Sequence, residues 1–321
     1  MLKLEQRKSV PGEEWRQLLA ALESSPLHLP EVLVVGVAPA DLDYFVLRSG
    51  AEVVAAGLGI TSTRRRLKLF KGARELYVPV FPALAKGCGF AAEVVAALVQ
   101  HARLSGYRQL EIDPRSGQDL SGLPELASRQ GHSLFEFTVD LSQDLEAILR
   151  GLHKKHRKNV REAEVHGLEI VEDTSLEGFL ALREMQESSS ERAAERGNSY
   201  GVQKEEFFRA TYEATYRNGP GRVLFARKDG VAVAALAFLS YGKKAVTVRS
   251  GSTPLGYQTS AMYLLQFELF RRLQQEGCLE LNIGGVPVEA AEPTHPQHGL
   301  FTYKRYYGGK QCLRTGLIIP L

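Results

Sequence analysis

Cysteine is scarce in this sequence, which has 321 residues and only three cysteines, Cys88, Cys278 and Cys312. So few thiols in so long a chain exclude a disulfide scaffold, and none has a second cysteine or a histidine at the spacing of a zinc site. We therefore expect a reducing compartment, buried thiols and no bound metal.

Long hydrophobic runs are also missing. The longest apolar run, Val231 to Leu239, is about half of the ~18 residues that a membrane-spanning helix needs. The first residues, MLKLEQRKSV, are polar and lack the apolar core of a secretory signal. These two absences predict a cytoplasmic protein.

Neither sign of charge prevails, because 40 lysines and arginines face 37 acidic residues, which leaves a net charge of +3. Such an even balance of charge does not by itself indicate a nucleic-acid-binding protein, and any anion site has to come from local clustering.

Nucleophile-elbow, Walker and zinc motifs are absent as well. The hydrophobic fraction of 44% excludes disorder, and the length favours two domains.

What the sequence does contain is an internal repeat. Residues 44–58 and 223–237 each predict a strand, a tight turn and a second strand. The turns are Ser49-Gly50 and Asp229-Gly230, where glycine supplies the positive φ that a two-residue hairpin needs. The two hairpins therefore mark the same point in two copies of one unit.

Each hairpin is followed by the same succession of elements. A helix, a strand, a short helix and a closing strand are predicted over 90–104, 108–113, 123–130 and 131–140, and again over 261–273, 279–284, 301–307 and 311–321. This order predicts an α/β fold of two tandem units with mixed β-sheets. We place the first domain at 1–143 and the second at 144–321.

A basic segment joins the two copies. Residues 144–164 predict one amphipathic helix, and residues 150–166 carry six lysines and arginines against two glutamates. Lys154, Lys158 and Arg161 lie on one stripe at i, i+4 and i+7, and a phosphate-bearing ligand would relieve their repulsion. The candidate phosphate-binding residues are Lys154, Lys155, Arg157, Lys158 and Arg161. A solvated helix face is the alternative.

Three further places can carry chemistry. Lys304, within Tyr303-Lys-Arg-Tyr-Tyr-Gly-Gly309, is either a fixed cation facing developing negative charge or a surface residue above an aromatic cluster. Asp113 ends a strand before Pro114, where α/β folds place catalytic groups, but where a simple turn is equally expected. Lys86, Gly87 and Gly89 precede a helix and loosely match a turn that holds a pyrophosphate.

These residues resemble the FemAB-like family of peptidoglycan aminoacyltransferases and its broader GNAT-type acyltransferase relatives. The basic segment 153–170 is similar to the family's Arg-x-x-Ile-Arg-x-Ala helix, which a glycine and a strand follow. Residues 303–309 are similar to its Phe-Lys-x-x-Phe-Gly-Gly, with tyrosines in place of phenylalanine, and Asp113-Pro114 matches its strand-ending acidic-Pro signature. The resemblance covers most of the chain, because the family has two tandem GNAT-like domains.

The resemblance implies transfer of an amino acid from aminoacyl-tRNA to an amine of a peptidoglycan precursor, with no bound cofactor. It implies that Lys304 lies near the reacting ester with Tyr303 as its aromatic neighbour, that Asp113 helps to deprotonate the amine, and that the basic helix faces phosphates of acceptor or donor, or a membrane surface. The long helical arm and the Trp-containing acceptor motif of several members are absent. One alternative is an acyl-CoA-dependent or acyl-carrier-dependent N-acyltransferase, with Lys86, Gly87 and Gly89 holding the pyrophosphate. Another is a non-catalytic binder of nucleic acid or anionic lipid.

Overall fold

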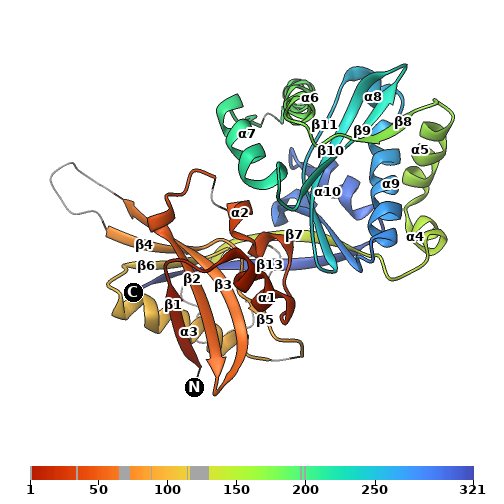
Figure 1. Ribbon diagram of the computed structural model, residues 1–321. Helices are drawn as coiled ribbons and strands as arrows, with labels where there is room; N and C mark the ends of the chain where they lie inside the picture. Colours follow the sequence, from red (N-terminus) through yellow and green to blue (C-terminus); the bar gives the residue numbers. More distant parts are fainter. Residues whose placement is uncertain are drawn as a thin grey trace. The chain divides into compact units, whose positions relative to one another are not determined.

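The computed structural model describes residues 2–33, 35–64, 73–87, 89–113, 115, 130–195, 197–198 and 200–321, in two compact units (Figure 1). Unit 1 contains residues 1–135 and 313–321, and unit 2 contains residues 136–312. The expected domains, 1–143 and 144–321, differ from these units mainly at the end of the chain, where residues 313–321 belong to unit 1.

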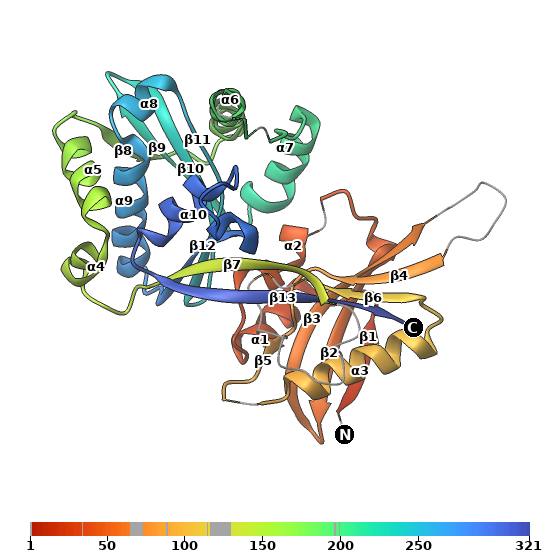
Figure 2. The same ribbon diagram turned by 180° about the vertical axis from the view of Figure 1, so that it is seen from behind.

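Unit 1 is a mixed sheet with helices on both faces. Its elements are β1 (Lys3–Arg7), α1 (Gly12–Ala20), the 3₁₀ turn η1 (Pro26–His28), α2 (Pro30–Leu33), the 3₁₀ turn η2 (Pro39–Asp41), β2 (Leu42–Ser49), β3 (Glu52–Arg64), β4 (Ala73–Val78), β5 (Ala83–Leu84), α3 (Ala91–Leu104) and β6 (Gln109–Ile112). Neighbouring residues on a strand point to opposite faces. On β2 the Tyr44 ring contacts Trp15 of α1, and the Phe45 ring contacts His101 of α3. The two helices therefore cover opposite faces (Figures 1 and 2).

Unit 2 repeats this plan with additional helices. Its elements are β7 (Gln130–Asp140, whose first residues belong to unit 1), α4 (Leu145–Gly151), α5 (Lys154–Glu164), β8 (Glu169–Glu172), α6 (Leu176–Ala194), α7 (Glu205–Thr211), the π-helical turn η4 (Tyr212–Tyr216), β9 (Gly221–Lys228), β10 (Val231–Tyr241), β11 (Lys244–Ser252), α8 (Pro254–Gln258), α9 (Ala261–Gln275), β12 (Glu280–Pro287), the 3₁₀ turn η5 (Val288–Ala291), α10 (His298–Arg305) and β13 (Lys310–Pro320, which ends in unit 1). Helices α6 and α7 lie on one side of the sheet, and α4, α5 and α9 lie on the other (Figure 1).

Both predicted hairpins are present, with one shift. In unit 2 the turn is Asp229-Gly230 as predicted, and both residues have positive φ, at 51° and 80°. In unit 1 the expected Ser49-Gly50 turn is wrong by one residue, because Ser49 pairs with Glu52 and the turn is Gly50-Ala51. Only Gly50, at φ 62°, is left-handed there, as at the first central position of a type II′ turn.

The repeat predicted from the sequence is confirmed by the strand order. β2, β3, β4 and β6 lie side by side in unit 1, and β9, β10, β11 and β12 do so in unit 2. In each unit the first three strands are antiparallel and the fourth joins the third in parallel. The same succession of pairings in both units indicates one duplicated scaffold.

The closing strands are exchanged between the copies. The strand that follows β12 in the chain is β13, and its residues Leu317 to Pro320 pair antiparallel with β6 of unit 1. The strand that follows β6 is β7, which adjoins β12 in unit 2. The short helix expected over 123–130 falls almost wholly outside the described residues, and Gln130 already belongs to β7.

The single helix expected over 144–164 is wrong, because the structure has two helices there. Leu152 and His153 are extended between α4 and α5. The His153 Nδ1 accepts from the Lys155 amide at 3.3 Å and caps α5, while Arg157 donates to the Arg150 and Leu152 carbonyls at 2.8 and 2.5 Å at the end of α4. Local caps thus outweigh the apolar spacing that runs through both helices.

Each helix in the described part of the chain is too short or too polar to span a bilayer.

Candidate active site

The site in unit 2 is a split between two parallel strands. β11 and β12 pair only over Lys244–Val246 and Glu280–Asn282. Beyond these residues the two strands are no longer paired. In the same stretch the register of β10 and β11 shifts, because Ala237 pairs with Arg249 and Phe238 with Thr247, so that Val248 is the extra residue of a β-bulge. A bulge re-aims side chains and ends pairing, which opens the sheet here.

A cavity of about 450 Å³ occupies this opening. It is lined from α6, the loop after α6, the ends of β11 and β12, α8, α9 and α10. The lining residues are Gln186, Ser189, Ala193, Asn198, Tyr200, Leu236, Thr247, Val248, Arg249, Ser250, Tyr257, Met262, Gln266, Ile283, Gln297, Leu300, Tyr303, Lys304 and Tyr307. Arg249 and Lys304 are the charged members of this set, so both charges in the cavity wall are positive.

Lys304 is held by the backbone of β12. It lies in the last turn of α10, and its Nζ donates a hydrogen bond of 2.6 Å to the Ile283 carbonyl. A methyl group at the next residue, Gly284, would lie 2.8 Å from that Nζ, and Gly284 has a φ of 81°. Glycine at this position therefore serves both the backbone conformation and the approach of the ammonium.

The surroundings of Lys304 disfavour its charge. Burial lowers the pKa of the Lys304 ammonium to about 8, and the negative charge of Glu136 only partly opposes this. Desolvation disfavours an ammonium, and the same low-dielectric surroundings strengthen its action on a nearby oxyanion. Lys304 therefore lies in a cavity rather than at the surface, and its action on developing negative charge stays a prediction.

An aromatic cluster supports α10. Tyr303 and Tyr307 share a hydrogen bond of 2.8 Å between their hydroxyls, and burial raises the pKa of each phenol. His156 of α5 packs against four tyrosine rings, those of Tyr263, Tyr303, Tyr306 and Tyr307. Its Nε2 lies 2.9 Å from the Tyr303 carbonyl, and burial lowers its pKa to about 4, so this histidine is a neutral donor that fixes α10.

Residues 150–305, which contain the split strands and Lys304, match the family model described as the acetyltransferase (GNAT) domain. These residues form a GNAT-type acyltransferase domain. No curated protein sequence matches it.

Solved structures extend this fold to both units. The crystal structure of FemX has a TM-score of 0.79 at 12% identity, covering 99% of this chain and 97% of that one. The structure of L-PGS from Bacillus licheniformis has a TM-score of 0.56 at 16% identity, covering 95% and 90%. A tandem GNAT protein from the clavulanic acid biosynthesis pathway has a TM-score of 0.50 at 17% identity, covering 100% and 98%. The predicted tandem GNAT fold, and the FemAB-like resemblance at the level of fold, are confirmed.

Asp113 lies outside the GNAT domain matched by the family model, at the end of β6 in unit 1. Its side chain is buried, with its Oδ1 2.9 Å from Arg115 Nε and its Oδ2 3.0 Å from the Tyr77 hydroxyl. Burial, with the charge of Asp113 next, raises the pKa of Tyr77 to about 12. The carboxylate is thus already bound within its own unit, and its role as a proton acceptor stays a prediction.

The five residues predicted to bind phosphate divide into two groups. Lys154, Lys155, Lys158 and Arg161 are exposed along α5. Lys158 pairs with Glu162 at 3.3 Å, a surface ion pair of small energetic value. Arg157 is half-buried and binds the carbonyls that end α4, so it acts as a cap. Four of the five predicted phosphate-binding residues are exposed, and their binding of phosphate stays a prediction.

The two glycine-containing turns before the long helices differ. In unit 1, Lys86 and Gly87 lie in a turn ahead of α3, with Gly87 at φ 72°, and Gly89 follows. In unit 2 the amides of Gly256, Tyr257 and Thr259 are already bonded to Thr253 or Leu255. These amides are therefore not free to bind a pyrophosphate. A role for Lys86, Gly87 and Gly89 stays a prediction.

Several residues of the cavity were not singled out from the sequence. Ile283 acts through its backbone carbonyl, which no side-chain motif reports. Gly284 was visible as one of two glycines that interrupt an apolar strand, a signal of close backbone approach. Arg249 and Gln266 lie in elements that contain several other polar residues, so no sequence pattern distinguishes them.

Proposed function

We propose that this GNAT-type acyltransferase forms an amide bond by transferring an amino acid from aminoacyl-tRNA to an amine of a peptidoglycan precursor. The observation that carries this proposal is the Lys304 ammonium, held 2.6 Å from the Ile283 carbonyl in the cavity between β11 and β12. FemX, whose fold the chain shares, supports the finer assignment of donor and acceptor.

The chemistry needs few groups from the protein. The neutral amine attacks the ester carbonyl carbon, a C–N bond forms, and the electron pair moves to the carbonyl oxygen. Lys304 donates a hydrogen bond to that oxyanion. The oxyanion then re-forms the carbonyl as the C–O bond of the ester breaks and the leaving oxygen departs. The proton of the amine passes to the leaving hydroxyl oxygen. No covalent enzyme intermediate forms.

The exposed stripe on α5 suits a large polyanionic substrate. Lys154, Lys155, Lys158 and Arg161 present like charges along 11 residues of helix, and phosphates would neutralise them. Contacts of this kind position a nucleic acid or a nucleotide-linked acceptor without specifying its sequence. In this proposal the stripe holds phosphates while the reacting ester enters the cavity.

An acyl-CoA donor is the second candidate. The match of residues 150–305 to the acetyltransferase (GNAT) domain favours it, and Lys86, Gly87 and Gly89 precede a long helix. The amides of the α8 turn in unit 2 are already hydrogen-bonded within the chain, which favours the tRNA donor instead.

Binding and turnover with each donor test the proposal. Thermal unfolding is measured with coenzyme A, with uncharged tRNA and with a UDP-linked muropeptide, since a ligand at about 100 times its Kd adds about 2.7 kcal/mol to native stability. We expect stabilisation by tRNA and muropeptide, and amide formation from aminoacyl-tRNA. Stabilisation by coenzyme A alone, with acyl-CoA turnover, would establish the second candidate and reject the first.

The pKa of Lys304 predicts the pH profile of the reaction. Because the ammonium form is the one that stabilises the oxyanion, kcat/KM should fall as pH rises through about 8, where the free enzyme loses this proton. The measurement is kcat/KM between pH 6.5 and 10 with an acceptor amine in excess. A Lys304→Arg variant, whose cation does not titrate in this range, should lack the descending limb. A wild-type rate that keeps rising above pH 9 would contradict the role of the ammonium.

A further inference from the structure

Arg249 is the second cation of the cavity and has a different setting from Lys304. It lies on β11 at the bulge, beside Val248, and pairs across the strand with Ala237. Its guanidinium carbon is 4.8 Å from the centre of the Phe208 ring and 5.8 Å from that of Phe207. Two aromatic rings thus hold the planar group at the cavity wall through cation–π contacts.

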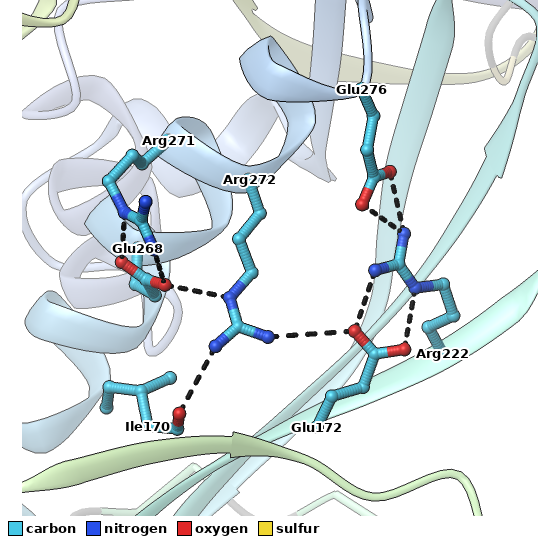
Figure 3. Close-up of polar contacts among 7 residues, drawn as sticks. All are labelled: Ile170, Glu172, Arg222, Glu268, Arg271, Arg272 and Glu276. Atoms are coloured by element: carbon cyan, nitrogen blue, oxygen red, sulfur yellow. Dashed lines mark hydrogen bonds and ion pairs between the residues drawn. The ribbon is translucent and has the colours of Figure 1, made fainter.

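Other arginines of the same domain are paired with carboxylates. Figure 3 shows Arg222 bound to both oxygens of Glu276 at 2.7 Å and to Glu172 at 2.7 and 2.8 Å. It also shows Arg272 bound to Glu268 at 2.8 Å. For Arg249, the described part of the chain supplies no carboxylate and no hydrogen-bond acceptor. Arg249 is one of the residues that line the cavity.

The cavity makes an unpaired arginine costly. Burial lowers the pKa of Arg249 below its usual value, because desolvation disfavours the charged form. Among the described residues that line the cavity there is no Asp or Glu. Arg249 is half-buried. A partly desolvated charge without a partner is unfavourable, so a position that keeps one indicates a partner that arrives with a ligand.

A second donor in the same wall lacks a partner. Gln266 of α9 is only 4% exposed, and its Nε2 has no hydrogen-bond acceptor in the structure. Gln186 of α6 has an equally unpaired Oε1. Buried amides are nearly always hydrogen-bonded, and an unsatisfied amide in a cavity wall points to a ligand.

We propose that Arg249 and Gln266 bind an anionic oxygen group, a carboxylate or a phosphate, on the substrate that enters this cavity. The planar guanidinium matches either group through two parallel hydrogen bonds. Gln266 of α9 supplies a neutral donor in the wall of the same cavity. The inference rests on the proposed function only in taking this cavity as the place where substrate binds, and it adds that the bound substrate carries a negative charge there.

Binding of small anions tests this directly, without turnover. The probes are inorganic phosphate and glutarate, with glutaramide as the uncharged analogue, measured by calorimetry and thermal unfolding at constant ionic strength. Wild-type protein should bind at least one anion, and Arg249→Met should weaken that binding at least tenfold. Preference for phosphate or glutarate identifies the anion. Arg209→Met, which removes an exposed arginine paired with Glu205, is the matched control.

The stability of the ligand-free variant separates binding from packing. If Arg249 awaits an anion, Arg249→Met should unfold at the wild-type temperature or above it, because a poorly solvated charge is removed. A lower unfolding temperature, together with anion binding equal to that of the wild type, would overturn the inference. So would equal binding of glutaramide and glutarate. If neither donor supports turnover while the Arg249-dependent anion binding persists, the proposed reaction fails and the anion site stands.

Discussion

Replacing Lys304 with alanine should lower kcat by about 10²–10³ while leaving the fold intact, the scale on which enzymes lose a single oxyanion donor. The reason is geometric. The Nζ is fixed by the Ile283 carbonyl inside the cavity, so its charge is in place before the reaction and needs no reorganisation. Single-turnover rates at pH 7 with saturating donor and acceptor measure the loss.

Two controls make this result decisive. Lys243→Ala removes an exposed lysine at the turn before β11 and should leave kcat unchanged. Thermal unfolding of Lys304→Ala should match the wild type within a few degrees, because the charge removed is itself poorly solvated. A kcat within threefold of wild type, in a protein that unfolds normally, would remove Lys304 from the mechanism.

Gly284→Ala should lower kcat by about 10², through displacement of Lys304. A methyl group there would lie 2.8 Å from the Nζ, so the ammonium has to move away from the Ile283 carbonyl. Misplacement of a catalytic group by about 1 Å can cost this much. The measurement is again the single-turnover rate, made in both the wild-type and the Lys304→Ala backgrounds.

The matched control for this variant is Gly277→Ala. Gly277 also has a φ of 81°, but its methyl group would meet nothing within 4 Å. Both variants should lose about 1–2 kcal/mol of stability from the left-handed backbone, and only Gly284→Ala should lose activity. In the Lys304→Ala background, Gly284→Ala should cost little more, because the two changes act on one group. A full additional loss there would show that Gly284 acts independently of Lys304.

The parts of the fold that local signals determine could be predicted from the sequence. The Asp229-Gly230 turn needs positive φ at both residues, and the apolar spacing of residues 261–273 fits only a helix. Because these signals occur twice, the duplication was visible without a structure. The break at Leu152 and His153 was not, since the apolar spacing continues across it and only the capping contacts of His153 and Arg157 reveal it.

The candidate site was predictable only in part. Lys304 was identified from its neighbours, but its burial depends on the parting of β11 and β12, which is set by a bulge at Val248 and by pairing between distant segments. Arg249 and Gln266 belong to no sequence motif. Each is a single polar residue, and only the structure shows that its donors have no partner among the described residues. The exchange of closing strands could not be predicted either, because the pattern of a strand does not name its partner.

The exchange of β7 and β13 also determines when the sheet of unit 1 can be completed during biosynthesis. During synthesis, β1 to β6 leave the ribosome about 205 residues before the segment Leu317 to Pro320 that pairs with β6. Until then β6 offers an open edge, which is a hazard for association with other chains. The amino-terminal half therefore cannot mature ahead of the rest, and dissecting the chain at residue 143 would yield a fragment that lacks one of its own strands.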